Sequence, residues 1–374
     1  MKLIRCARCA MSSTRPGIVF DAEGICRPCR VSDERKTIDW GARWRELIDL
    51  CDKHRRDDGA YDCLITGSGG KDSHFQVHVL KEKLGMHPLL LNIANYSYTK
   101  TGWDNFLNWN ETFNCDVVSL FLRRKAAKTF TRIAFERLGS PTWSWDRCVY
   151  SWPIQEALRR NIPLIVYGEN ISYEYGGAQE ESPYAYEQIN NEAVRPLNVE
   201  EWIDWSRGEL DRHDFAPMLY PDQGVVREKL QPIYLSYFVP WSGRANAERS
   251  KLWGFKTLDH EWVRKGFAEQ YDQIDSAGYL LHPWIKYPKY GHQRVTDVCA
   301  LWVRQGLMDR YTAMKLILDN DYILDEKIVE DFAAFCGYTA REVYDILDRW
   351  YNPDLFVRDE YGVWKSKEWL CGMP

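Results

Sequence analysis

The sequence lacks an apolar run long enough to cross a membrane. Its longest aliphatic runs, such as residues 89–91, are short, whereas a membrane-spanning helix needs about 20 apolar residues. The amino-terminal residues also lack the apolar segment of a signal peptide. A cytoplasmic protein with no membrane partner is therefore expected. Its 11 cysteines are expected to be thiols or metal ligands rather than disulfides.

An excess of basic charge is also absent. The formal net charge is -5 and no long block of like charge occurs, whereas proteins that bind nucleic acid usually present a basic face. A nucleic acid is therefore an unexpected partner. Aromatic residues are abundant instead, with 17 Trp and 22 Tyr, and rings in polar stretches suit grooves or interfaces as well as a core.

Short apolar runs alternate with segments of helical periodicity between residues 61 and 168. Strands are expected at residues 61–66, 88–94, 117–122 and 163–167, with a fifth at 232–238. Helices are expected between them, at residues 71–84, 103–113, 126–138 and 150–160. This alternation is typical of an α/β fold with a doubly wound parallel sheet.

The chain is expected to divide into three regions. Residues 1–35 form a zinc ribbon, residues 36–240 form the α/β domain, and residues 241–374 form a mainly helical region. A polar stretch at residues 170–230 breaks the alternation and is interpreted as an insertion. Helical periodicity returns near the carboxyl end, at residues 295–305, 311–318, 326–335 and 340–350.

Four cysteines near the amino terminus form two CxxC pairs, made of Cys6, Cys9, Cys26 and Cys29. Four thiolates at this spacing can close a tetrahedral zinc site. A closed site has no open coordination position, so a structural Zn²⁺ is predicted. An iron–sulfur cluster or a pair of disulfides would be the alternatives.

A glycine-rich string, Ser68-Gly69-Gly70-Lys71-Asp72-Ser73, follows the first expected strand. Its glycines let backbone N–H groups approach an anion, Lys71 adds a positive charge, and the serines add hydroxyl donors. A Walker loop would need Ser or Thr at position 72 and a dinucleotide fingerprint would need Gly, but Asp72 stands there. A glycine turn capped by Asp and Ser is the purely structural alternative.

The string resembles the PP-loop of the ATP pyrophosphatases, whose fold belongs to the HUP-like α/β class. This resemblance implies ATP and Mg²⁺ as ligands and AMP as a product. It assigns the phosphates to Ser68, Gly69, Gly70, Lys71 and Ser73. It leaves Asp72 to assist Mg²⁺ or to orient the loop.

A wider resemblance covers most of residues 6–300. The string from Cys6-x-x-Cys9-x-Met11-Ser12 through Thr14-Arg15-Pro16 to Phe20-Asp21 is similar to the N-acetyl sugar amidotransferase family, of the WbpG and PseA type. Two further sets of strings agree, namely Gly168-Glu169-Asn170 with Glu174-Tyr175-Gly176-Gly177, and Lys286-Tyr287 with Gly291 to Asp297. One position departs from the family, because His292 stands where an aromatic residue is usual.

The family resemblance implies an enzyme of bacterial surface-polysaccharide synthesis, in the lipopolysaccharide or nonulosonic acid branch. Such an enzyme is a carbon–nitrogen ligase that uses ATP and ammonia to convert an acetamido group of a UDP-linked sugar into an acetamidino group. AMP and pyrophosphate are released. The resemblance also implies two partners that supply ammonia, a HisH-like glutaminase and a HisF-like subunit.

Further site residues are expected where strands end. Gly168, Glu169 and Asn170 follow the fourth strand, where doubly wound sheets bind ligands. Gly168 is assigned to the nucleotide and Asn170 to the substrate, while Glu169 joins Lys71 and Asp72 as a catalytic candidate that contacts Mg²⁺ or the substrate amide. A helix cap is the alternative role for Glu169.

Three further residues complete the interpretation. Lys286 and Arg294 are candidate contacts to the anionic nucleotide sugar, with a solvated basic face as the alternative. Cys148 stands beside Arg147 just before an expected helix, and a buried inert thiol is the favoured interpretation over a reactive one.

No glutaminase motif accompanies these residues. The chain begins Met1-Lys2 and contains no Gly-x-Cys-x-Gly elbow, so ammonia is expected from solution or from a partner. Two other functions stay open, a PP-loop tRNA thiolase with a zinc ribbon and a non-enzymatic zinc-ribbon adaptor. The sequence identifies neither the sugar nor the modified acetamido position.

Overall fold

A five-stranded parallel sheet forms the centre of the molecule in this computed structural model, which describes residues 3–170, 181–187 and 195–370. The strand order is β3-β2-β1-β4-β5. The strands are β1 (Cys63–Thr66), β2 (Pro88–Ile93), β3 (Val117–Leu120), β4 (Leu164–Tyr167) and β5 (Gln231–Tyr234). The predicted doubly wound α/β fold is confirmed.

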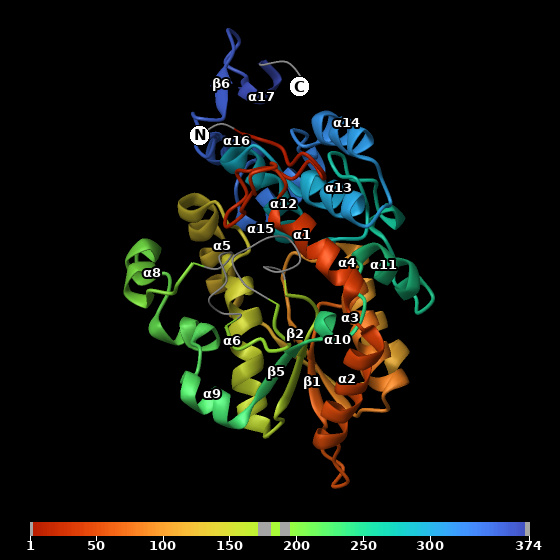
Figure 1. Cartoon of the computed structure of the whole chain (residues 1–374). Helices are drawn as coiled ribbons and strands as arrows, with labels where there is room; N and C mark the ends of the chain where they lie inside the picture. The colour runs from red at the N-terminus through yellow and green to blue at the C-terminus, as the bar shows by residue number, and fades with distance from the viewer. Residues whose placement is uncertain (1–2, 171–180, 188–194, 371–374) are drawn as a thin grey trace.

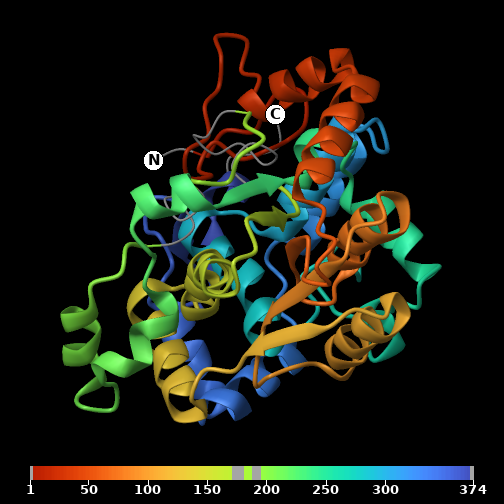
Figure 2. The same cartoon turned by 90° about the horizontal axis from the view of Figure 1, so that it is seen from below.

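Helices cover both faces of this sheet (Figures 1 and 2). Cys63 and Ile65 of β1 point into a core shared with α2 (Trp40–His54), α3 (Lys71–Val77) and α4 (Lys100–Phe113). Leu64 points the other way, into a core shared with α6 (Trp143–Arg160) and α9 (Gln223–Lys229). Because both faces are buried, most successive strand residues are apolar, which explains the short continuous runs in the sequence.

The chain changes direction across the sheet between β1 and β4. It runs outward from β1 through β2 to β3, then returns to β4 and continues to β5 on the other side. In doubly wound sheets this reversal opens a crevice at the carboxyl ends of the two central strands. The PP-loop follows β1 and Gly168 follows β4, so both segments border the crevice.

Helices from the carboxyl-terminal part lie over one end of the sheet (Figure 1). They have their own apolar core, in which Phe332 of α15 (Glu326–Cys336) packs edge-on against Phe135 of α5 (Arg124–Leu138), with ring centroids 5.0 Å apart. This contact joins the helical region to the α/β domain. The helices and strands of this part are α11 (Gly243–Lys251), α12 (Ala277–Tyr290), α13 (Arg294–Arg304), α14 (Arg310–Asn320), α15 (Glu326–Cys336), α16 (Ala340–Asp348), β6 (Phe356–Arg358), β7 (Trp364–Ser366) and α17 (Lys367–Leu370).

The described residues also form shorter turns and further helices. The 3-10 turns are η1 (Arg35–Thr37), η4 (Arg212–Met218) and η5 (Leu258–His260), and the π-helical segment η2 (His78–Lys83) extends α3. The other helices are α1 (Arg27–Glu34), α5 (Arg124–Leu138), α8 (Val199–Ser206) and α10 (Leu235–Phe238).

Several predicted boundaries differ from the structure. The fifth strand ends at Tyr234 rather than at residue 238, because the chain turns into α10 and the Ser236 N–H donates to the Gly168 carbonyl at 2.9 Å. Helix α6 begins at Trp143 rather than at residue 150, so Cys148 lies inside the helix and not ahead of it. Helices α11 and α12 and the β6–β7 hairpin were not predicted.

The Phe332 contact predicts a large stability effect. Phe332→Ala should lower the free energy of unfolding by about 3–5 kcal/mol, since it removes a fully buried ring from the core that joins the two layers. Chemical denaturation provides the measurement. Tyr311→Ala, at a position 80% exposed, should change this free energy by no more than about 0.5 kcal/mol. Equal effects of the two substitutions would contradict the assigned core.

Candidate active site

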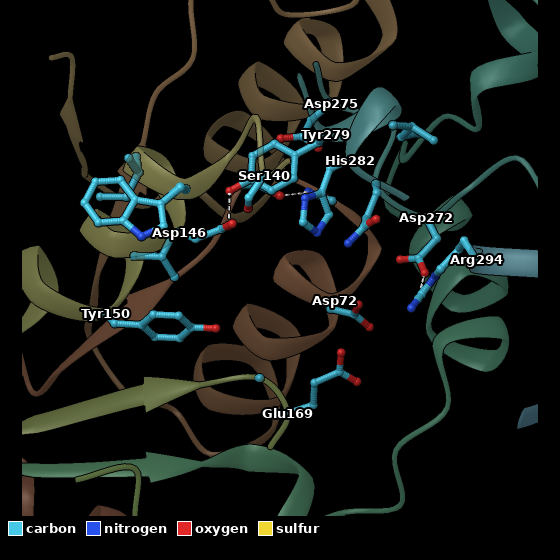
Figure 3. A pocket seen from close by; sticks show the side chains of 18 of the residues that line it. Asp72, Ser140, Asp146, Tyr150, Glu169, Asp272, Asp275, Tyr279, His282 and Arg294 are labelled. Atoms are coloured by element: carbon cyan, nitrogen blue, oxygen red, sulfur yellow. Dashed lines mark hydrogen bonds and ion pairs between the residues drawn. The ribbon is translucent and has the colours of Figure 1, made fainter. Parts of the chain in front are cut away.

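A cavity of about 840 Å³ lies at the carboxyl ends of β1 and β4. Its lining combines segments that are far apart in the sequence (Figure 3). The PP-loop and Glu169 come from the α/β domain, while Asp272 and residues of α12 and α13 come from the carboxyl-terminal part. Arg15 and Pro16 reach it from the amino-terminal region.

The PP-loop is a tight turn that its own side chains stabilise. The Ser68 N–H donates to Ser73 Oγ at 3.0 Å, and Ser68 Oγ accepts from the Gly70 N–H at 3.3 Å. Gly69 has φ +84°, and a Cβ at this position would lie 2.5 Å from Phe106 Cα. Only glycine therefore lets the loop pack this closely against α4. Residues 67–73 all line the cavity, as a phosphate-binding loop requires.

Lys71 joins the loop to the carboxyl-terminal region. Its buried ammonium donates to Asp72 Oδ2 at 2.7 Å and to Asp272 Oδ1 at 2.8 Å. The second oxygen of Asp272 pairs with Arg294. Asn246 Nδ2 from α11 donates to Asp72 Oδ1 at 2.8 Å. Two residues predicted separately, Lys71 and Arg294, thus meet through Asp272, which sequence analysis missed because no motif marks it.

The residues after β4 lie beside the PP-loop. Glu169 Oε2 accepts from Trp241 Nε1 at 2.9 Å, and Figure 3 shows its side chain pointing toward the same space as Asp72. Gly168 also lines the cavity, and a Cβ there would lie 3.2 Å from the Trp241 ring. Asn170 is buried, and it is absent from the described residues that form the lining.

A second charged group forms the wall between the amino-terminal region and α12. The buried carboxylate of Asp297 pairs with Arg15, and Lys286 Nζ lies 3.8 Å from its other oxygen. Burial alone would raise the pKa of Asp297, but the charges of Arg15 and Lys286 hold this pKa well below its ordinary value. Burial lowers the pKa of Lys286, against the attraction of Asp297. The predicted substrate residue Lys286 therefore lines the cavity as part of an ion network.

A third group in the lining contains Asp146 and Tyr279. Asp146 accepts hydrogen bonds from Thr142 Oγ1 at 2.6 Å and from the Tyr279 hydroxyl at 2.9 Å. Thr142 Oγ1 also lies 3.2 Å from His282 Nδ1. Burial raises the pKa of Asp146 to about 6. Sequence analysis missed these residues because they are isolated in the chain, and only the packing of α6 against α12 brings them together.

The carboxyl-terminal part of this cavity matches a known family. Residues 265–370 match the family model described as LPS biosynthesis protein WbpG-like, C-terminal domain. This segment is similar to that C-terminal domain and is called the WbpG-like domain. It contributes Asp272, Lys286 and Arg294 to the cavity, so the WbpG-like domain and the PP-loop share one site.

Other relatives are more distant. An uncharacterized protein of Methanocaldococcus jannaschii is 24% identical over 180 residues, which cover 47% of this chain and 63% of the relative. The match thus spans less than two thirds of that protein.

Two solved structures have a TM-score of 0.30 with this chain. The NMN synthetase from Francisella tularensis is 13% identical, and the match covers 59% of this chain and 88% of that chain. The NH3-dependent NAD synthetase from Campylobacter jejuni is 14% identical, with coverages of 58% and 97%. At this TM-score the likeness supports no conclusion about activity.

Most of the strings that carried the family resemblance meet at the cavity. Arg15, Glu169, Lys286 and Arg294 all line it, whereas the string 174–177 lies outside the described residues. His292, which departs from the family pattern, is buried and lines the cavity, and its Nδ1 lies 3.3 Å from the Tyr290 carbonyl oxygen. Burial lowers the pKa of His292 to about 3. Its imidazole is therefore neutral at the position where the family usually has an aromatic residue.

The four amino-terminal cysteines form a buried cluster whose Sγ atoms all lie within 4.8 Å of one another. The Sγ–Sγ distances are 3.9 Å for Cys6–Cys29, 3.5 Å for Cys9–Cys26 and 3.7 Å for Cys26–Cys29. Tetrahedral Zn²⁺ with Zn–S bonds of about 2.3 Å places sulfur atoms about 3.8 Å apart. The cluster therefore fits the predicted structural Zn²⁺.

This cluster packs directly on the WbpG-like domain. Ala300 of α13 belongs to the same apolar group, and Arg304 Nη1 lies 3.6 Å from Cys9 Sγ. A metal held here would fix the amino-terminal region against α13. It would thereby support the loop that carries Arg15 into the cavity wall.

The cluster predicts a metal requirement for the amino-terminal region. Cys26→Ala should reduce the zinc content, measured by elemental analysis, from about one ion per chain to near zero, because a ligand is lost. The midpoint of thermal unfolding should fall with it. Cys51→Ala, which removes another buried thiol, should keep the zinc. Full zinc content in Cys26→Ala, or iron in its place, would contradict the assignment.

Cys148 is buried in α6, and burial raises the pKa of its thiol. The neighbouring Arg147 donates its Nε to the Met218 carbonyl at 3.1 Å. A thiol in these surroundings resists forming a thiolate, as the favoured interpretation of Cys148 requires.

In the described part of the chain, no helix combines the length and apolar character that crossing a membrane requires.

The low pKa of Asp297 predicts a pH-dependent contribution to stability. In the unfolded chain Asp has a pKa of about 3.9, so the ionised carboxylate favours the folded state above this pH. This contribution is lost as the pH falls toward the lower pKa of the folded state. Asp297→Asn should lower the free energy of unfolding by about 3 kcal/mol at neutral pH.

The difference between the wild type and Asp297→Asn should shrink below about pH 4, as measured by urea unfolding at several pH values. Asp345→Asn changes an aspartate whose side chain is 60% exposed and pairs with Arg341, and should have little effect at any pH. A difference for Asp297→Asn that stays constant with pH would contradict the ion network.

Proposed function

We propose that this protein is an ATP-dependent, AMP-forming amidotransferase that converts an acetamido group of a UDP-linked sugar into an acetamidino group with ammonia. One observation carries the proposal: a single cavity is lined both by the PP-loop and by a WbpG-like C-terminal domain. An ATP-splitting loop and a polysaccharide-biosynthesis domain that share a cavity favour activation of a sugar substrate at that loop.

The PP-loop end of the cavity suits the triphosphate of ATP. Lys71 and Arg294 supply positive charge, and the turn built on Gly69 places the backbone against the cavity. Asp72 and Glu169 are carboxylates beside this loop, and carboxylates are the ligands Mg²⁺ prefers. Stabilisation of charge on the phosphates is the main catalytic contribution expected of these groups.

Activation of the amide follows from its chemistry. An amide carbon is a poor electrophile because the nitrogen donates electrons into the carbonyl. Attack of the amide oxygen on the α-phosphorus releases pyrophosphate, and loss of the amide N–H proton to solvent leaves a neutral O-adenylyl imidate. Ammonia then adds to the imidate carbon, and AMP departs with the electron pair of the C–O bond.

The nucleotide part of the sugar substrate is anionic and needs cations. Lys286 from α12 and Arg15 from the amino-terminal region line the same cavity as Arg294, and guanidinium groups suit phosphate oxygens. Asp297 holds Lys286 and Arg15, and Asp272 holds Arg294. The geometry of these three cations is therefore fixed before a ligand binds.

Ammonia is proposed to come from a HisH-like glutaminase working with a HisF-like subunit. The cysteines in the described part of the chain are all buried, which fits a chain that does not itself hydrolyse glutamine. The isolated chain is therefore expected to accept ammonium but not glutamine.

Incubation with ATP, Mg²⁺, ammonium and UDP-acetamido sugars tests the proposal. Mass spectrometry should detect a sugar lighter by the difference between oxygen and NH, together with AMP. Lys71→Ala should reduce both signals by at least about 100-fold, because it removes the charge at the phosphates. Lys53→Ala, an exposed lysine of α2, should not.

Several outcomes would contradict the proposal. Unchanged AMP formation in Lys71→Ala would exclude the PP-loop as the site of activation. AMP formation only on addition of tRNA, lost at high salt, would favour a thiolase instead, although the burial of Cys148 disfavours that chemistry. Absence of nucleotide binding would favour an adaptor.

A further inference from the structure

Asp146 lies in the same cavity as the PP-loop but away from its phosphate-binding groups. Figure 3 shows Asp146 and Tyr279 on one side of the cavity, and Asp72 and Glu169 on another. Asp146 is half-buried and belongs to the lining of the cavity. It is anchored from two elements, by Thr142 next to α6 and by Tyr279 of α12. A carboxylate held in this way faces the space where a substrate would sit.

Both ends of the cavity carry charged groups. Lys71 and Arg294 lie at the PP-loop end with the carboxylates Asp72 and Asp272. Asp146 and Asp275 lie at the other end, where the charge of Asp146 helps to raise the pKa of Asp275 and the charge of Lys286 acts on Asp146. A small cation such as ammonium can donate a hydrogen bond to the Asp146 carboxylate at this end.

We propose that Asp146 is the catalytic base that takes a proton from the incoming ammonium ion. This inference rests on the proposed function. Ammonium has no lone pair and cannot attack the imidate carbon, so one N–H bond must break first. Asp146 accepts that proton and passes it to solvent, and the freed electron pair forms the new C–N bond. The C–O bond to AMP then breaks with its electron pair on AMP.

The proton balance completes the step. Of the three hydrogens that remain on the attacking nitrogen, two stay and one moves to the sugar nitrogen, so the product leaves as an amidinium cation. Asp146 returns to its carboxylate form for the next cycle. Its hydrogen bonds from Thr142 and Tyr279 orient the carboxylate, which makes Thr142 and Tyr279 positioning residues.

The titratable groups around Asp146 define its pH behaviour. Arg147 and Tyr150 share its helix, Tyr279, His282 and Lys286 face it from α12, and Asp275 precedes that helix. Burial raises the pKa of Asp146 to about 6, while the hydrogen bonds from Thr142 and Tyr279 lower it. A base must be unprotonated, so the ammonia step should be lost as the pH falls through about 6.

Asp146→Asn separates the two halves of the reaction. Sugar-dependent exchange of pyrophosphate into ATP needs no ammonia and should be unchanged, which also reports that the variant is folded. Amidine formation at neutral pH should fall by roughly 10²–10⁴-fold. At constant total ammonium, the rate of amidine formation by Asp146→Asn should rise tenfold per pH unit below the pKa of ammonium, because it follows the concentration of free ammonia. The rate of the wild type should instead be independent of pH above the pKa of Asp146.

Two further variants test the assignment of this pKa. Tyr279→Phe removes a hydrogen bond that lowers the pKa of Asp146, so the acid limb should move to higher pH. Burial also raises the pKa of Asp275 to about 6, and Asp275→Asn should keep an acid limb if Asp146 is the base. Asp319→Asn, at an exposed position of α14, should match the wild type throughout.

The possible results distinguish this inference from the proposed function. If the wild type catalyses no sugar-dependent exchange, the proposed function and the role of Asp146 both fall. If exchange occurs but Asp146→Asn keeps the wild-type rate and pH profile of amidine formation, only the role of Asp146 is wrong. An acid limb that is lost in Asp275→Asn would also overturn it and assign the base to Asp275.

Discussion

The buried ammonium group of Lys71 is the constraint on which the cavity depends. A charge removed from water is tolerated only with charged or hydrogen-bonding partners. One partner, Asp72, comes from the same loop, and the other, Asp272, comes from the WbpG-like domain and is shared with Arg294. The electrostatic needs of one lysine thus tie the carboxyl end of the sheet to the helices that cover it.

The amino-terminal region is joined to the same structure by a packed cysteine cluster and an ion pair. Its cysteine cluster packs on α13 through Ala300, and Arg304 contacts Cys9. The loop beyond the first two cysteines then carries Arg15 to the buried carboxylate of Asp297. Because this region has little apolar material, a metal is a suitable way to hold it in place. All three regions of the chain therefore contribute to one cavity.

This division suits a reaction that brings together a nucleotide, a sugar and ammonia. The PP-loop end holds Lys71 and Arg294 with their carboxylate partners. The end near Asp146 combines carboxylates with Lys286 and the aromatic residues Tyr150 and Tyr279.

The parts of the molecule whose chemistry is local could be predicted from the sequence. The PP-loop string, the spacing of Cys6, Cys9, Cys26 and Cys29, and the alternation of apolar runs with helical periodicity led to the loop, the cysteine cluster and the doubly wound sheet. Each depends on residues that are close in the chain or on a repeated period, so no distant contact was needed. Boundaries were less certain where tertiary contacts decide them, as at the end of β5 and the start of α6.

The residues that complete the site are isolated in the sequence, and long-range packing brings them together. Asp272 and Asp146 belong to no motif, and they line the cavity because α6 and the WbpG-like domain pack around the carboxyl end of the sheet. Asn246 of α11 reaches the site by donating to Asp72. The protonation of carboxylates in the site also depends on burial and on neighbours from other segments, as the raised pKa of Asp146 and the low pKa of Asp297 illustrate. Such properties arise from long-range packing and electrostatics, which a linear sequence does not contain.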